Sequence, residues 1–236
     1  MSRYAILGDC HSPAMLEEYP NFVLDICEQW DVPSDNIYHI GDVVDFHALS
    51  RWDSELGHQD VMAEYDAAME QVQVLYEAFP TLKILTGNHD EIPQRQAKSL
   101  NLPPQFMKDH NKIWETPDWH WFPRYHKEYI EEGNFQIAHG DGLPGGKTPS
   151  LRAAEQDWCC TVSGHIHTAA GAWFGCNDSA RYWGMNVGTG IDHSHPCFNY
   201  SRTTAKKPMI GMGLVIDGTP IFEPMAKFNK FGRRVA

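Results

Sequence analysis

Residues 4–11 read YAILGDCH, an apolar run that stops at a glycine and is followed by an aspartate and a histidine. A short apolar run with a turn signal behind it predicts a buried β-strand. Asp9 and His11 lie two positions apart, so an extended segment would point both side chains to the same face. In open α/β sheets, ligands collect just beyond the carboxyl ends of the strands. The stretch therefore predicts an α/β fold whose first strand delivers two polar side chains to a site.

The same pattern returns four more times along the chain. A short apolar run ends beside a glycine and a residue able to bind metal in the segments 40–42 (IGD), 86–90 (TGNHD), 138–140 (AHG) and 163–167 (SGHIH). Glycine beside each candidate ligand lets the backbone turn sharply and approach a site closely. We therefore expect the five strand ends to converge on one place.

The candidate ligands offer nitrogen and oxygen but no thiolate sulfur. They are Asp9, His11, Asp42, Asn88, His139, His165 and His167. This donor set suits Mn, Fe, Zn, Ni or Co better than a purely oxygen-bound Mg or Ca site. It has too many members for one ion with an open position, but it suits two ions about 3.5–4 Å apart that share a carboxylate. Each segment alone could be an ordinary turn, since Asn and Asp favour turns, but the five together predict a dinuclear site.

In their order along the chain, the five segments resemble the motifs of the calcineurin-like metallophosphoesterase superfamily. The superfamily pattern is D-x-H, G-D-x-x-D, G-N-H-[DE], H and G-H-x-H, and the matching residues here are 9–11, 41–45, 87–90, 139 and 164–167. The resemblance implies an α/β fold, namely a four-layer α/β/β/α sandwich of two mixed β-sheets flanked by helices. It also implies a phosphoesterase with two divalent metal ions as cofactors, manganese being favoured.

The resemblance assigns a role to each motif residue. The first metal would be bound by Asp9, His11 and His167, the second by Asn88, His139 and His165, and Asp42 would bridge the two. His89 would lie outside the metal shell, as the acid for the leaving oxygen or as a phosphate ligand, and Asp45 would orient it. A carboxylate beside His89 would raise the pKa of the imidazole and keep its proton available.

The match differs among branches of the superfamily. Protein Ser/Thr phosphatases carry G-D-x-V-D-R-G and G-N-H-E-x-R, whereas this chain has Phe46-His47 after Asp45 and has Asp90 in place of the glutamate. The missing arginine, which would clamp phosphate, argues against protein phosphatase activity. The tract 41–52 and the pairs Lys207-Pro208 and Pro224-Met225 are similar to uncharacterised phosphoesterases of bacteriophage genomes.

A phosphodiesterase acting on a nucleotide or on single-stranded nucleic acid is therefore the favoured hypothesis. One alternative is a phosphomonoesterase acting on phosphoprotein or nucleotide. Another is a metal-binding protein that binds a partner without turnover, although a protein of that kind would have no reason to keep His89 and Asp45.

The segment 91–124 differs in composition from its surroundings, being polar, proline-containing and rich in tryptophan. Because it directly follows His89, we interpret it as an irregular or helical cap insertion over the metals. Its tryptophans, Trp114, Trp119 and Trp121, could stack on a base, but packing onto the core is the favoured interpretation. Arg95 and Arg124 either reach a phosphate or are solvated at the surface.

Two late segments carry basic residues. The loop 191–208 holds His193, His195, Tyr200, Arg202, Lys206 and Lys207, and is either part of the rim of the site or a solvated loop. The tail holds Lys227, Lys230, Arg233 and Arg234, a small basic cluster on a chain of formal net charge −12. That net charge argues against broad, non-specific binding of nucleic acid.

Length and composition fit a single domain spanning 1–236. The chain has no apolar run of membrane-spanning length, and its N-terminal apolar run is too short for a signal peptide. We expect a cytoplasmic protein, in the host cytoplasm if a phage encodes it. None of its six cysteines falls in a C-x-x-C pair, so free thiols are expected.

Periodicity predicts the main helices and strands. The apolar stripe in 58–79 predicts the clearest helix, and a second helix is predicted from Ser12-Pro13 to Trp30, with Pro20 as a break or kink. Strands are predicted at 4–7, 37–40, 82–85, 125–130, 135–138, 161–163, 169–174, 181–186, 209–216 and 219–223.

Overall fold

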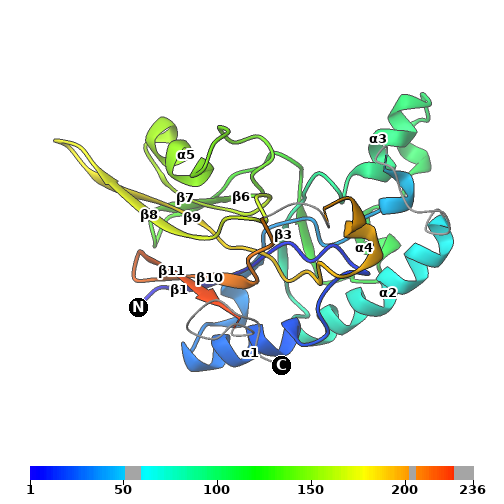
Figure 1. Cartoon of the computed structure of the whole chain (residues 1–236), viewed down its shortest axis with the longest axis horizontal. Coiled ribbons are helices and arrows are strands. Elements are labelled where there is room, and N and C mark those ends of the chain that lie inside the picture. Colours follow the sequence, from blue (N-terminus) through cyan, green and yellow to red (C-terminus); the bar gives the residue numbers. More distant parts are fainter. Residues whose placement is uncertain (51–59, 202–205, 226–236) are drawn as a thin grey trace.

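The computed structural model describes residues 1–50, 60–201 and 206–225, and it contains two mixed β-sheets flanked by helices (Figure 1). This arrangement confirms the predicted α/β class and the two mixed sheets. In Figure 1, α5 lies above one sheet, while α1 and α2 lie below the other. The described part of the chain contains no helix long and apolar enough to cross a membrane.

The first sheet runs in the order β11-β10-β1-β2-β3-β4, with the N-terminal strand near its middle. Strands β1 to β4 are parallel, whereas β10 pairs antiparallel with β1 and β11 antiparallel with β10. The bounds are β1 Arg3–Leu7, β2 Ile37–His39, β3 Lys83–Leu85, β4 His120–Phe122, β10 Gly211–Ile216 and β11 Thr219–Pro224. The carboxyl ends of β1, β2 and β3 therefore lie at one edge.

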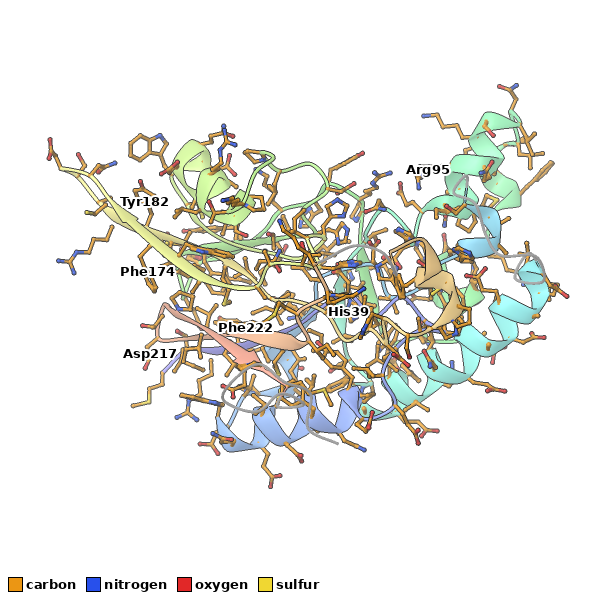
Figure 2. All side chains as sticks on the ribbon, in the orientation of Figure 1. His39, Arg95, Phe174, Tyr182, Asp217 and Phe222 are labelled. Carbon is orange, nitrogen blue, oxygen red and sulfur yellow. The ribbon has the colours of Figure 1, made fainter. Side chains whose placement is uncertain are left out.

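The second sheet runs in the order β5-β6-β7-β9-β8. Its parallel part is β6, β7 and β9, with β5 and β8 antiparallel at its edges. The bounds are β5 Glu128–Ile130, β6 Phe135–Ala138, β7 Cys160–Ser163, β8 Gly171–Cys176 and β9 Arg181–Asn186. The β8–β9 hairpin, which carries Phe174 and Tyr182, projects away from the rest of the molecule (Figure 2).

Strand β1 shows why the sheets are layered. Ala5 and Leu7 pack in the core shared with the helices, while Tyr4 and Ile6 belong to the core between the two sheets. Alternate residues of a strand face opposite sides, so a strand apolar throughout must be covered on both faces. Helices α1 (Tyr19–Gln29) and α2 (Val61–Ala78) cover the first sheet, and α5 (Pro149–Asp157) packs on β7 and β9 of the second.

One of the two long helices confirms the sequence prediction, whereas the other begins later than predicted. The predicted helix 58–79 is α2, whose N-cap Asp60 accepts hydrogen bonds from the backbone N–H groups of Met62 and Ala63; residues 58–59 lie outside the described residues. The helix expected from Ser12 begins only at Tyr19, so its predicted start was wrong. Pro20 lies in its first turn, where proline costs no hydrogen bond, so it begins the helix instead of breaking it.

The predicted insertion 91–124 is partly core. It forms helix α3 (Ile92–Ser99), the 3₁₀ turn Pro104–Phe106 and the short helix α4 (His110–Ile113), and it ends in strand β4, which pairs with β3. Other 3₁₀ turns are Ser34–Asn36, His47–Leu49 and Pro196–Ser201. Pairing between distant segments, which periodicity does not detect, makes β4 a strand of the sheet and not part of a cap.

Candidate metal centre

The five ligand-bearing segments follow β1, β2, β3, β6 and β7, at the carboxyl ends of the parallel strands of both sheets. The structure brings all the predicted metal-binding residues together there. His39, the last residue of β2, lies near the centre of the molecule, while Arg95 lies on α3 at the helical end (Figure 2). The ligand-bearing loops approach each other closely: a Cβ on Gly87 would lie 2.1 Å from Asp42 Oδ1, so only glycine fits there.

The first ligand group comprises Asp9, His11 and His167, whose ligand atoms all lie within 4.8 Å of one another. His167 Nε2 is 3.0 Å from Asp9 Oδ2 and 3.2 Å from His11 Nε2. The two imidazole nitrogens thus face each other beside a carboxylate. The spacing i, i+2 predicted for Asp9 and His11 delivers both side chains to this point.

The second ligand group comprises Asp42, His139 and His165, again within 4.8 Å of one another. Asn88 belongs here as well, because its Oδ1 lies 3.2 Å from His139 Nε2. The other ring nitrogen of His139, Nδ1, lies 3.0 Å from the carbonyl oxygen of Ile40 and can donate to it. That contact leaves Nε2 of His139 to face the ligand group.

Asp42 joins the two groups. Its Oδ2 lies 3.3 Å from His139 Nε2 and 3.6 Å from His11 Nε2, so one carboxylate oxygen stands between a histidine of each group. The backbone N–H of His89 donates to its other oxygen over 2.7 Å. Asp42 adopts a left-handed conformation, with φ of 49°, which turns the chain sharply after β2.

The donor set fits divalent cations. Asp9 Oδ1 is buried and has no hydrogen-bond partner among the described residues, a costly state that a bound cation would relieve. Burial lowers the pKa of His11 and of His165, which keeps both imidazoles neutral, the form that binds metal. Nitrogen and carboxylate oxygen together suit Mn, Fe, Zn, Ni or Co.

Metal binding by these residues should depend on pH, because one of the candidate ligands, His139, holds a proton at neutral pH. Burial acts to lower the pKa of His139, but the neighbouring carboxylates, Asp42 foremost, raise it to about 10. Cation binding would therefore displace a proton from this imidazole. The pKa of Asp42 lies well below its usual value, because the histidines around it outweigh the effect of burial.

Asp45 lies close to three histidines and not only to the one that the sequence suggests, the most distant being His47, whose Nδ1 is 3.9 Å from Asp45 Oδ2. Its Oδ1 lies 3.0 Å from His89 Nδ1, as predicted for an orienting carboxylate, and also 2.7 Å from His11 Nδ1. His89 Nδ1 additionally lies 2.8 Å from the carbonyl oxygen of Asp45. Asp45 thus orients both a candidate ligand and the candidate acid. His11, Asp42 and His89 also form a ligand group of their own, so His89 lies close to the metal positions.

Asp90 is a structural partner that sequence reasoning missed. Its buried carboxylate accepts hydrogen bonds from the backbone N–H groups of Asp42 and Gly87, each at 2.8 Å, and of Val44 at 3.2 Å. It therefore ties the loop after β2 to the loop after β3. Burial, with Asp42 nearby, raises the pKa of Asp90 to about 7. The only sequence signal was its place in the G-N-H-D motif.

Of the two arginines that could bind a substrate phosphate, one lies beside the candidate metal centre and the other does not. Arg95 lines a cleft of about 400 Å³ together with Asn88 and His89, and its guanidinium donates to the carbonyl oxygen of Asn88 over 2.8 Å. Arg124 does not line this cleft, because it pairs with Asp141 at 2.6 Å and with Glu91 at 3.7 Å.

Of the three tryptophans of the insertion, two are buried and the third, Trp121, is half-buried and packs against the same core. Trp114 and Trp119 are buried in the core below the first sheet, which confirms the packing interpretation for both and excludes them as base-stacking platforms in this state.

The late basic segments predicted from the sequence are described only in part. In the loop 191–208, Phe198 contacts the ring of His11 at 5.7 Å between centroids. Arg202 and the basic tail residues Lys227, Lys230, Arg233 and Arg234 lie outside the described residues.

No protein-family model matches this sequence and no curated protein matches it significantly, so the functional argument depends on the residues and on their geometry.

Proposed function

We propose that this protein is a dinuclear-metal-dependent phosphoesterase of the calcineurin-like metallophosphoesterase type. The observation that carries the proposal is the pair of ligand groups joined by Asp42, whose Oδ2 lies within 3.6 Å of a histidine from each group. A shared carboxylate between two nitrogen-rich ligand groups is the arrangement expected for two ions about 3.5–4 Å apart.

Each ligand group has a defined task in this proposal. Asp9, His11 and His167 would hold one cation, and Asn88, His139 and His165 the other, with Asp42 shared between them. Two divalent cations there would supply Lewis-acid polarisation of the phosphoryl group and would acidify a water molecule for attack. Manganese is the favoured metal, and the nitrogen and oxygen donors also suit Fe, Zn, Ni or Co.

His89 would donate the proton to the leaving oxygen. Burial acts to lower its pKa, but the carboxylates of Asp42 and Asp45 raise it to about 10, so the imidazole carries a proton at neutral pH. Its Nδ1 is engaged by Asp45, which leaves Nε2 as the nitrogen available for proton transfer. The contact between Asp45 and His89 also speaks against a non-catalytic metal-binding partner protein.

A phosphodiesterase acting on a nucleotide or nucleic acid is favoured over a phosphomonoesterase. The residue after Asp45 is Phe46, which supplies no cation to balance the extra charge of a monoester. The alternative, a phosphomonoesterase acting on protein or nucleotide, is supported by Arg95, the cation in the cleft beside His89.

The decisive experiment compares hydrolysis of bis-p-nitrophenyl phosphate and p-nitrophenyl phosphate with Mn²⁺ added and then with EDTA. We expect faster, chelator-sensitive cleavage of the diester. Asp42→Asn, which removes the shared charge, should lower both the metal content and the rate by more than the roughly 10–100-fold typical of residues that only orient a ligand. Faster monoester cleavage would favour the phosphatase, and bound metal without hydrolysis of either substrate would contradict the proposal.

A further inference from the structure

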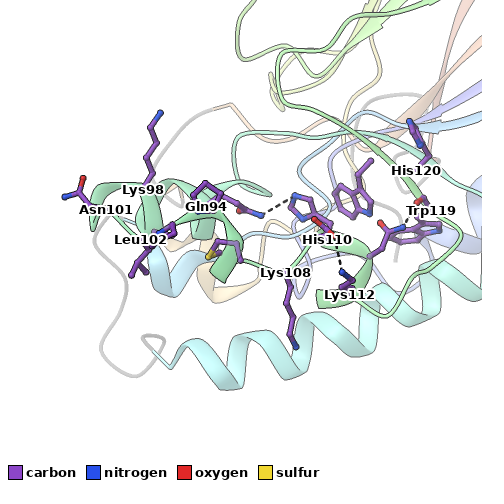
Figure 3. Close-up of a pocket in the computed structure, with 16 residues that line it drawn as sticks. Gln94, Lys98, Asn101, Leu102, Lys108, His110, Lys112, Trp119 and His120 are labelled. Carbon is purple, nitrogen blue, oxygen red and sulfur yellow. Dashed lines mark hydrogen bonds and ion pairs between the residues drawn. The ribbon is translucent and has the colours of Figure 1, made fainter.

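A groove lies on the other side of α3 from the cleft that is lined by Asn88, His89 and Arg95. This groove, of about 1090 Å³, is lined by residues of the insertion that include Gln94, Lys98, Lys108, His110, Lys112 and Trp121 (Figure 3). Its volume is at or above the upper end of the range for sites that bind organic ligands. None of the predicted metal-binding residues lines it.

The rim of the groove is cationic. Lys98, Lys108 and Lys112 line it, against a single aspartate, Asp109, which pairs with Lys112 at 3.4 Å. Lys98 and Lys108 have no carboxylate partner among the described residues. On a chain of formal net charge −12, a groove with a local excess of positive charge would focus anionic ligands to one place.

The inner wall of the groove is aromatic and apolar. His110 stacks on Trp121 with ring centroids 4.4 Å apart and an interplanar angle of 19°. Burial lowers the pKa of His110 to about 4, so its ring is neutral at physiological pH. Leu102 and Met107 add apolar surface to the same hollow. A cationic rim over an aromatic and apolar wall suits a ligand with both anionic and planar parts.

Helix α3 connects the groove to the metal centre. Its residues Gln94, Ala97 and Lys98 face the groove, while Ile92, Arg95 and Gln96 face the cleft that contains His89. Arg95 and Lys98 lie three residues apart and are therefore neighbours on the helix surface. Cationic side chains thus continue across α3 from the metal centre to the groove.

We propose that the groove binds single-stranded nucleic acid, whose backbone crosses α3 at Arg95 and Lys98 to present a phosphodiester to the metal centre. The presentation step rests on the proposed phosphoesterase function, but the binding step does not. A single strand exposes unpaired bases to the inner wall and phosphates to the lysines, whereas a duplex hides its bases.

Binding is measured with the full-length, Mn²⁺-loaded protein by fluorescence anisotropy of a labelled, hydrolysis-resistant phosphorothioate oligothymidylate. The test variant is Lys98→Gln/Lys108→Gln. The matched control is Lys147→Gln/Arg181→Gln, which removes two exposed cations that do not line the groove. We expect the test variant to weaken binding about tenfold and to reduce the slope of log affinity against log salt by about 1.4, at ~0.7 per lost phosphate contact. The control should bind nearly as the wild type does.

Three outcomes would overturn the proposal. They are no binding by the wild type, equal losses in the two variants, and binding of a duplex of the same length as tightly as the single strand. Hydrolysis of bis-p-nitrophenyl phosphate by the wild type separates the two proposals. Specific binding without that hydrolysis would support the groove as a nucleic-acid site and contradict the phosphoesterase. Hydrolysis without binding would support the phosphoesterase and contradict the nucleic-acid site.

Discussion

At the scale of single residues, the contact between His89 and Asp45 carries the most specific chemistry. The Asp45 carboxylate lies 3.0 Å from His89 Nδ1 and 2.7 Å from His11 Nδ1, so one buried charge acts on a candidate acid and a candidate ligand. The roles of His89 as acid and His11 as ligand can be separated by experiment. An acid matters only when the leaving oxygen needs a proton, whereas a metal ligand matters for every substrate.

The first prediction concerns the leaving group. His89→Ala should reduce turnover of an alkyl diester by about 10²–10⁴-fold, while turnover of a nitrophenyl diester should fall much less, because nitrophenolate leaves without a proton. Rates are compared at equal metal content, measured by elemental analysis. Equal losses on both substrates would remove the acid role and leave His89 as a metal or phosphate ligand, in keeping with its place in a ligand group with His11 and Asp42.

The second prediction concerns pH. The folded protein raises the pKa of His89 from 6.5 to about 10, so the imidazole stays protonated well above neutral pH and loses its proton as the pH rises through about 10. Cations bound at Asp42 offset part of that carboxylate's charge, so the basic limb of the metal-loaded enzyme should lie below pH 10.

Asp45 is, with Asp42, one of the two carboxylates that raise the pKa of His89. Asp45→Asn removes its charge and should therefore shift the basic limb of the kcat profile to lower pH. The measurement is kcat against pH on an alkyl diester, again with metal content checked, because Asp45 also contacts His11. A basic limb that stays in place would show that His89 does not set it.

At the scale of elements, the site depends on how loops at the ends of separate strands are held against each other. Asp90, in the loop after β3, accepts backbone hydrogen bonds from Asp42 and Val44 in the loop after β2. The shared candidate ligand is thus positioned by a carboxylate from a different loop. Loss of such supporting partners around a metal site typically weakens metal affinity by about 10–100-fold.

The third prediction follows from these bonds. Asp90→Ala would leave three buried N–H groups without their acceptor, each costing about 1–3 kcal/mol. We expect a lower melting temperature and metal affinity weaker by about 10–100-fold, measured by calorimetric titration. Asp25→Ala, an exposed change on α1, is the matched control. Unchanged metal affinity in Asp90→Ala would show that the two loops keep their geometry without this carboxylate.

At the scale of the whole molecule, the end that contains α2, α3 and α4 is built around buried aromatic rings. Trp114 is fully buried, stacks on Tyr65 of α2 at 5.3 Å between centroids, and lies 5.6 Å from Phe46, the residue after Asp45. The insertion is therefore tied to α2 and to the loop of the metal centre. Its shape is set by the core, and its open face is the groove.

The fourth prediction tests this role. Trp114→Ala should cost about 3–5 kcal/mol of unfolding free energy, as expected for removal of a fully buried large aromatic ring. The Michaelis constant for nucleotide substrates should stay close to that of the wild type under conditions where the variant is folded. Trp158→Ala, at a position 73% exposed, is the control and should be nearly neutral in thermal melts. A raised Michaelis constant without a loss of stability would favour the base-stacking hypothesis instead.

The sequence by itself determined the set of candidate ligands and the strand ends that carry them. Each ligand segment couples a short apolar run to a glycine and a polar residue, and this local pattern is legible because it depends only on neighbouring residues. Asp9 and His11 illustrate it, since their spacing alone predicts that they share a face, as they do in the first ligand group. The class of fold followed from the same strands.

Only the tertiary structure decided which side chains meet. That Asp45 contacts His11 and that Asp90 ties two loops together both depend on contacts between residues distant in the chain. The same holds for β4, which becomes a strand only by pairing with β3, and for the groove, whose lining residues are brought together from α3, α4 and β4. Such contacts are fixed by packing and burial over the whole chain, and no local pattern contains them.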